Sequence, residues 1–107
     1  MGNVYIIGVG MIRFNKYPDK TVISMAHEAT DLALKDAGLA REDLDAVFFS
    51  NTFWGMFDNQ HSIRGEVVMR RMGVGKVPVV NVENACAGGS TALHLAYTGI
   101  RSGMYDV

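Results

Sequence analysis

The stretch Val77-Pro78-Val79-Val80-Asn81-Val82 is rich in β-branched residues, and the small, uncharged stretch Asn84-Ala85-Cys86-Ala87-Gly88-Gly89-Ser90-Thr91-Ala92-Leu93 follows it. A β-branched run favours a buried strand, and the second stretch opens a helix-like segment. Together they predict a strand over 77–83, a sharp turn, and a helix over 86–102 that ends at Gly103. A strand, a turn and a helix in this order are the building block of an α/β fold.

Cys86, the only cysteine of the chain, lies at this predicted turn. The first N–H groups of a helix lack partners and favour negative charge, so we expect a thiol there to lose its proton more readily than a free cysteine. The residues around it are small and leave room for a substrate: Ala85, Ala87, Gly88 and Gly89. Cys86 is therefore the candidate nucleophile. The alternative is a buried cysteine that serves as a small core hydrophobe.

Two further short apolar runs, at residues 4–9 and 46–50, predict buried parallel strands. Between them, apolar residues recur at helical spacing and predict a helix that Thr21 caps and Gly38 ends. The order βαβαβα therefore predicts an α/β fold with a mainly parallel sheet and helices on both faces. With 107 residues, the chain has room for one domain.

The segments between the predicted strands over 46–50 and 77–83, and the C-terminal end, are less regular. The aromatic stretch 51–59 is expected to be a loop, and residues 60–72 are expected to form an amphipathic helix. In that helix, Ile63, Val67 and Val68 would face inward, and Arg64, Arg70 and Arg71 would face solvent. Asp106 and Val107 are expected to begin a fourth strand.

No charged residue occurs from Asn84 to Ile100. The stretch is too short and too polar to span a bilayer, which requires about 20 apolar residues. A helix without a polar face is buried all round, whereas a small α/β layer covers only one side of it. We therefore expect the chain to associate with further residues or with another copy.

Ten basic and eleven acidic residues give a net charge of −1, which excludes an electrostatic surface for nucleic acid or an anionic membrane. A single cysteine excludes an intrachain disulfide and suits a reducing compartment. The N-terminus lacks the basic and apolar regions of a secretory signal. These features predict a cytoplasmic protein.

Other candidate sites are weaker. Gly8-Val9-Gly10 follows a predicted strand, but Arg13 stands where a dinucleotide fingerprint requires its third glycine. His27, His61 and His94 share no metal-ligand spacing with one another or with Cys86, so no metal site is predicted.

The stretch from Asn84 to Leu93 resembles the nucleophile motif of the thiolase superfamily, most closely its sterol-carrier-type and archaeal-type acetyl-CoA acetyltransferases. Residues 4–14 and 33–47 also resemble the opening of that subfamily, so the resemblance covers the whole chain. Thiolases commonly have serine where Gly88 stands, and condensing enzymes like ketoacyl synthase III tolerate glycine near this position. Thiolases are also several times longer, and their remaining catalytic motifs lie in a C-terminal half that is absent from residues 1–107.

The resemblance implies that Cys86 accepts an acyl group from acyl-CoA, with its own backbone N–H in the oxyanion site. Coenzyme A would be a substrate or product, and no cofactor would be bound permanently. The partner would be a second copy or the remainder of a thiolase-like polypeptide, and residues 1–107 alone would be inactive. The alternatives are a condensing enzyme, an aldolase acting on CoA-linked side chains, or a non-catalytic α/β subunit that completes a partner.

Overall fold

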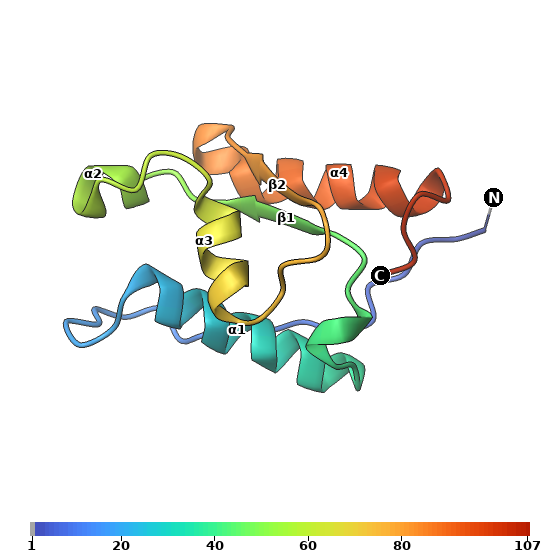
Figure 1. The fold of residues 1–107 in the computed structure, drawn as a ribbon, viewed down its shortest axis with the longest axis horizontal. Helices are drawn as coiled ribbons and strands as arrows, with labels where there is room; N and C mark the ends of the chain where they lie inside the picture. Colours follow the sequence, from blue (N-terminus) through green and yellow to red (C-terminus); the bar gives the residue numbers. More distant parts are fainter. Residues whose placement is uncertain (1) are drawn as a thin grey trace.

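The computed structural model describes residues 2–107, which form a two-stranded parallel sheet with helices on both faces (Figure 1). This confirms the predicted α/β class. Two single 3₁₀ turns accompany the regular elements, which in chain order are α1 (Val22–Ala37), the 3₁₀ turn Arg41–Asp43, β1 (Val47–Ser50), α2 (Trp54–Asp58), α3 (Arg64–Arg71), β2 (Val79–Val82), the 3₁₀ turn Ala85–Ala87 and α4 (Gly88–Arg101).

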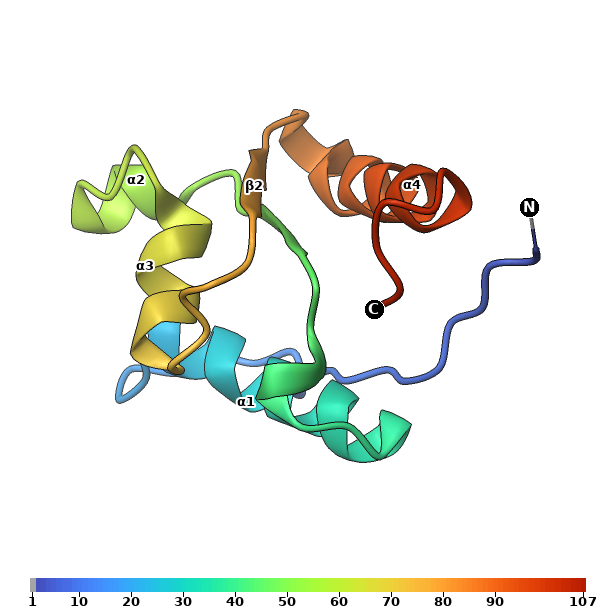
Figure 2. The same cartoon turned by 45° about the vertical axis from the view of Figure 1, so that its right-hand side comes forward.

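The two strands pair in parallel, with Phe49 opposite Asn81 and Ser50 opposite Val82. Because side chains alternate along a strand, the sheet presents two distinct faces. Phe49 and Asn81 face α3, where a Cβ added at Gly65 would lie 2.7 Å from the Phe49 Cβ. Ser50 faces α4. Figure 2 shows the sheet between α3 and α4, so the two helices cover opposite faces.

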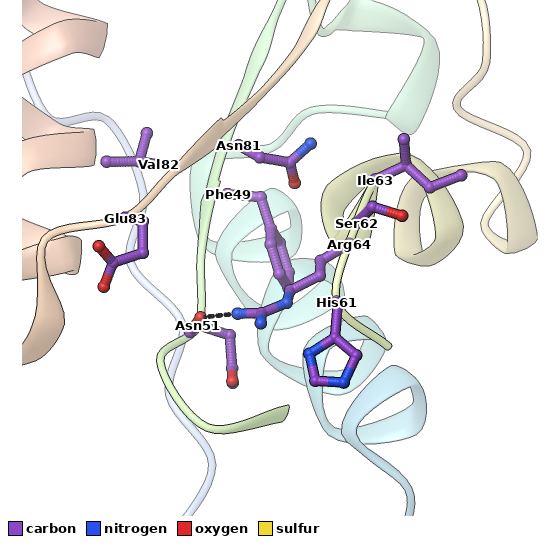
Figure 3. Close-up of a pocket in the computed structure, with 9 residues that line it drawn as sticks. All are labelled: Phe49, Asn51, His61, Ser62, Ile63, Arg64, Asn81, Val82 and Glu83. Atoms are coloured by element: carbon purple, nitrogen blue, oxygen red, sulfur yellow. Dashed lines mark hydrogen bonds between the residues drawn. The ribbon is translucent and has the colours of Figure 1, made fainter. Parts of the chain in front are cut away.

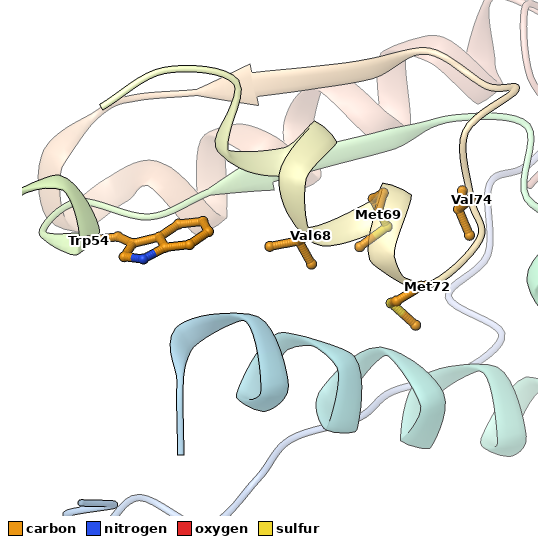
Figure 4. Close-up of a cluster of buried hydrophobic side chains, with 5 residues drawn as sticks. All are labelled: Trp54, Val68, Met69, Met72 and Val74. Atoms are coloured by element: carbon orange, nitrogen blue, oxygen red, sulfur yellow. The ribbon is translucent and has the colours of Figure 1, made fainter. Parts of the chain in front are cut away.

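The buried core lies on the α3 face of the sheet, between the strands and α1 (Figure 4). Val68 is fully buried at its centre. Half-buried residues of α1 pack against this cluster, so α1 forms the outer layer on this side. The five buried members are Trp54, Val68, Met69, Met72 and Val74.

Helix α1 begins and ends where the sequence predicts. The Thr21 Oγ1 accepts a hydrogen bond from the Ser24 N–H at 3.0 Å, and the Ser24 hydroxyl oxygen accepts one from the Thr21 N–H at 3.0 Å. Gly38 ends the helix in the left-handed conformation, with φ of 69°. Both signals are local in sequence, which is why composition and spacing reveal them.

The predicted strand over residues 4–9 is wrong for the described chain: the segment is extended but pairs with no strand among residues 2–107. It lies along α1, where Gly8 and Gly10 approach the helix too closely for a side chain. The Val9 N–H donates to the Asp36 carboxylate at 2.9 Å. An apolar run favours extended backbone, but a strand also requires a neighbouring edge, and here a helix is the neighbour.

Asp106 and Val107, the expected entry to a fourth strand, are not assigned to a strand among residues 2–107. The N–H groups of Asp106 and Val107 both donate to the Asp45 carboxylate, at 2.9 and 3.0 Å. The Asp45 N–H in turn donates to the Val107 carbonyl oxygen at 2.9 Å. The carboxylate and the backbone N–H of Asp45 together therefore bind this segment.

The expected loop over 51–59 contains the short helix α2, which corrects that prediction. The Asn51 Oδ1 accepts hydrogen bonds from the N–H groups of Phe53 and Trp54, at 3.1 and 2.7 Å, and so starts the helix. The Trp54 indole N–H donates to Asp58 at 2.8 Å, one turn further along. This pairing holds the helix although the stretch has no amphipathic spacing.

Helix α3 begins at Arg64 rather than at residue 60, because Ile63 has a left-handed backbone with φ of 44°. Ile63 was expected to face inward and is instead 58% exposed. Arg64 was expected to face solvent and is instead half-buried, since its side chain turns back toward the preceding loop. The inward faces of Val67 and Val68 and the exposure of Arg70 and Arg71 agree with the prediction.

The strand predicted over 77–83 is observed as the shorter β2. The helix predicted over 86–102 is divided into the 3₁₀ turn Ala85–Ala87 and α4. Gly88 and Ala92 bury one face of α4 against the sheet. On the other side, Leu93 is 58% exposed and Tyr97 is 48% exposed.

Within residues 2–107, no helix combines the length and apolar character needed to cross a membrane.

Candidate functional site

The carboxyl ends of β1 and β2 lie at the same edge of the sheet because the strands are parallel. Ligands of open α/β sheets bind outside this edge. Thr52 follows β1 here, and the turn with Cys86 follows β2. Cys86 is exposed, which is the opposite of the buried core cysteine that the sequence left open as an alternative.

The residue before Cys86 has an unusual backbone. Ala85 has a positive φ of 46°, a left-handed conformation that costs an L-residue with a Cβ roughly 1–2 kcal/mol. Two side chains bind its peptide groups. The Thr52 hydroxyl donates to the Ala85 carbonyl oxygen at 2.8 Å, and the Glu83 carboxylate accepts from the Ala85 N–H at 2.8 Å. These bonds offset part of the cost and set the direction in which the chain enters Cys86.

The turn is also fixed to the start of α4. The Ala87 N–H donates to the Asn84 carbonyl oxygen at 2.9 Å, which closes the 3₁₀ turn. The Asn84 side-chain amide donates to the Thr91 hydroxyl at 2.9 Å, and that hydroxyl donates to the Ala87 carbonyl oxygen at 2.9 Å. Cys86 therefore lies in a turn that is hydrogen-bonded both to its own helix and to the end of β1.

Gly88, the first residue of α4, lies directly against Ser50 at the end of β1. A Cβ added at Gly88 would overlap the Ser50 Oγ and lie 3.2 Å from the Ser50 Cβ. The small residue at this position therefore brings the start of α4 against the sheet. The sequence suggested that Gly88 leaves room for a substrate, but the structure shows that this glycine faces the strand.

A pocket of about 170 Å³ lies at the same edge of the sheet, between the ends of both strands and the loop before α3 (Figure 3). Arg64 and His61 line it from the loop side, and Glu83 lines it from the turn that carries Cys86. The Arg64 guanidinium donates to the carbonyl oxygens of Asn51 and, at 2.9 Å, Gln60. Arg64 thus anchors the segment that leads from β1 to Thr52.

The three histidines lie apart in the fold. The His27 Nε2 donates to the Val68 carbonyl oxygen at 2.9 Å, so this ring ties α1 to α3. His61 lies at the pocket, whereas His94 is exposed on α4. Residues 2–107 contain no cluster of three or more potential metal ligands. Gly8 and Gly10 pack against α1, so they do not form a phosphate-binding turn.

Thr52 and Arg64 were not identified from the sequence as site residues. Thr52 lies 33 positions before Ala85, and only the pairing of β1 with β2 brings the two together. Arg64 has the sequence pattern of a solvent-facing helix residue, although its helix starts too late for that pattern to apply. Neither contact leaves a local signal in the sequence.

Comparison with known proteins places these features in a family. The thiolase N-terminal domain matches residues 4–107. The chain is 34% identical along its whole length to an acetyl-CoA acetyltransferase of Methanothermobacter thermautotrophicus, of which it covers 28%. It is 33% identical, over 96% of its length, to sterol carrier protein 2 of Homo sapiens, of which it covers 18%.

A solved structure shows the same fold. The 3-oxoacyl-[acyl-carrier-protein] synthase III of Aquifex aeolicus matches 92% of the chain with a TM-score of 0.74 and 25% identity, and the match covers 31% of that structure. The chain therefore spans less than a third of the proteins that it resembles. The match over residues 4–107 and the parallel-sheet fold show that this chain belongs to the thiolase N-terminal domain family.

Proposed function

We propose that this chain supplies the nucleophile of an acyltransferase that moves acyl groups between coenzyme A thioesters through an acyl-Cys86 intermediate. The observation that carries the proposal is the exposed position of Cys86 in a fixed turn before α4, at the edge of the sheet where ligands bind. The family supports the substrate class, since the archaeal relative is named an acetyl-CoA acetyltransferase.

The proposed reaction has two steps. The Cys86 thiolate attacks the thioester carbonyl carbon, a new S–C bond forms, and the bond to the coenzyme A sulfur breaks to release coenzyme A. The acyl-cysteine then passes its acyl group to the carbanion of a second acyl-CoA or, in the reverse direction, to free coenzyme A. Backbone N–H donors at the turn, including that of Cys86, would stabilise the oxyanion in both steps.

We further propose that residues 1–107 alone do not complete this reaction. They span 28% of the archaeal relative's length, and the ring of His27 is already committed to a structural hydrogen bond. The groups that move protons would come from the remainder of the polypeptide or from a second copy. A cytoplasmic location is consistent with the reactive thiol that this mechanism requires.

The test is an exchange assay with the complete protein. Isotopically labelled coenzyme A is mixed with unlabelled acetyl-CoA, and transfer of the label into acetyl-CoA is measured. This exchange needs only the first step and its reversal. We expect the wild type to exchange and Cys86→Ser and Cys86→Ala to lose exchange by at least about a thousandfold, because a nucleophile has no substitute in covalent catalysis. Thermal unfolding of both variants controls for folding.

The other outcomes each point to a different function. An aldolase does not need an acyl-cysteine, so a wild-type protein that cleaves its substrate without exchange would favour that activity. Undiminished exchange in Cys86→Ser would identify the chain as a non-catalytic subunit. Either result overturns the proposal.

A condensing enzyme is the second candidate, favoured by the structural likeness to a 3-oxoacyl-[acyl-carrier-protein] synthase III. Such an enzyme shares the acyl-cysteine step but passes the acyl group to a different acceptor. Comparing acyl-CoA with an acyl-carrier-protein thioester as the second substrate distinguishes the two activities.

A further inference from the structure

We infer that Thr52 and Glu83 are positioning residues for Cys86, acting together through the backbone of Ala85. The inference rests on the proposed function, since it concerns how the nucleophile is held. Both side chains bind the peptide groups of the residue directly before Cys86: Thr52 binds its carbonyl oxygen and Glu83 binds its N–H, each at 2.8 Å.

We call these two hydrogen bonds, which join Thr52 and Glu83 to the peptide groups of Ala85, the clamp. The backbone of Ala85 explains why the clamp is needed. Its φ of 46° lies in the left-handed region that residues with a Cβ avoid. Without the two hydrogen bonds, Ala85 would relax toward a right-handed or extended backbone. Cys86 is the next residue, so the relaxation would rotate its side chain away from its present direction.

The two halves of the clamp come from different strands. Glu83 follows β2 and is local to the turn, whereas Thr52 follows β1 and lies 33 residues before Ala85. Thr52 is itself anchored, because Arg64 donates a hydrogen bond to the carbonyl oxygen of the preceding residue, Asn51. The direction of Cys86 is thereby set relative to the sheet, and not only relative to its own helix.

A positioning role makes a specific kinetic prediction. A small displacement of a reacting group lowers the rate of the chemical step much more than it weakens substrate binding. Removing one half of the clamp should therefore slow acylation of Cys86 and leave the KM for acyl-CoA nearly unchanged. In this proposal, Thr52 and Glu83 act only through the backbone of Ala85 and do not contact the reacting atoms.

The first experiment measures acylation of Cys86 by acetyl-CoA in the complete protein, by mass spectrometry at a series of short times. We expect Thr52→Val, which keeps the shape and loses the hydroxyl, to slow acylation by about tenfold or more. Thr52→Ser keeps the hydroxyl and should react at nearly the wild-type rate. Equal rates for wild type and Thr52→Val would overturn the inference.

A second pair of variants tests Glu83 and separates hydrogen bonding from charge. Glu83→Gln keeps an oxygen that accepts from the Ala85 N–H, and Glu83→Ala removes it. Both variants lose the negative charge, so a difference in acylation rate between them comes from the hydrogen bond and not from the charge. We expect Glu83→Ala to be slow and Glu83→Gln to be close to wild type. This pair also decides the question if Thr52→Val does not fold.

The third experiment tests the route through Ala85. Glycine adopts a positive φ without the cost that alanine bears. Adding Ala85→Gly to Thr52→Val should therefore restore part of the lost rate. No restoration would contradict the route through Ala85. A raised KM in Thr52→Val with an unchanged maximal rate would show that the hydroxyl contacts substrate instead. If wild-type Cys86 takes up no acyl group at all, the proposed function has failed, which is a separate result.

Discussion

Gly88 gives the sharpest prediction at the scale of a single residue. Its missing side chain lets the start of α4 lie against Ser50, where a Cβ would overlap the Ser50 Oγ. We expect Gly88→Ala to destabilise the complete protein by about 1–3 kcal/mol, the usual cost of inserting an atom into a packed contact. Urea unfolding of the variant and the wild type measures this difference.

Two further substitutions control that prediction. Gly89→Ala is the matched control, because a Cβ at this neighbouring position would meet nothing within 4 Å. It should leave stability unchanged or raise it slightly, since alanine favours a helix over glycine. Ser50→Ala in the Gly88→Ala background should restore part of the loss. If Gly88→Ala and Gly89→Ala unfold at the same urea concentration, the contact with Ser50 is not needed.

The residues around Cys86 also show how far a sequence predicts a site. Its place between a strand and a helix followed from the change in residue type at one point of the chain, and the structure agrees. The left-handed Ala85 and its contact with Thr52 did not follow, because alanine gives no sign of a positive φ. Contacts between strand ends depend on the pairing of the strands, which no local pattern encodes.

At the scale of elements, one ion pair joins α1 to the 3₁₀ turn that follows it. The Arg41 guanidinium forms two hydrogen bonds with the Asp31 carboxylate, at 2.8 and 3.1 Å, and a third with the Met72 carbonyl oxygen at 2.9 Å. The hydrogen bond from Arg41 lowers the pKa of Asp31, against a smaller opposing effect of burial. The pair thus connects α1 with the end of α3 through Arg41.

This lowered pKa predicts a pH-dependent contribution to stability. A carboxyl group whose pKa is lower in the folded state stabilises the fold above its unfolded pKa of about 3.9, and the contribution is lost as pH falls through the folded pKa. At pH 5 to 7 we expect the wild type to have a higher melting temperature than Asp31→Asn. The difference should be small because the ion pair is exposed. This gap in melting temperature between the two proteins should disappear as the pH is lowered.

Melting temperatures of the two proteins between pH 3 and pH 7 measure this effect. Glu42→Gln is the control, because it removes a second carboxylate beside Arg41, one whose effect on Arg41 is coulombic. It should not reproduce the pH-dependent gap. A gap for Asp31→Asn that stays constant over this pH range would contradict the assignment to the ion pair.

The elements that the sequence predicted well are those with local signals. Helix α1 has its capping residues at both ends, and the strands β1 and β2 are short β-branched or aromatic runs. Helix α2 was missed because its start depends on the Asn51 side chain and not on apolar spacing. The segment 4–9 was overpredicted because an apolar run indicates extended backbone but does not identify a pairing partner.

At the scale of the whole molecule, apolar surface is left uncovered on α4 and on the N-terminal segment, among other places. The outer face of α4 exposes Leu93 and Tyr97, and the extended N-terminal segment exposes Tyr5, Ile6 and Ile7 by 58–71% of their surfaces. Monomeric proteins rarely expose apolar patches larger than a few hundred Å². The charge-free stretch in the sequence predicted this for α4 before the fold was known.

We therefore expect residues 1–107 in isolation to associate or to lose structure. Sedimentation velocity over a range of concentrations detects association, and amide hydrogen exchange reports on α4. A soluble monomer with slow exchange along α4 at all concentrations would show that the chain covers its own apolar surface. That result would remove the need for a second copy or for further residues.

The central claim is that Cys86 carries the acyl group. The most direct measurement is peptide mass spectrometry of the complete protein after brief incubation with acetyl-CoA and acid quenching. The account predicts a mass increase of one acetyl group on the peptide that contains Cys86, removed by hydroxylamine and absent from Cys86→Ala. An acetyl group that persists in Cys86→Ala or lies on another residue would contradict it.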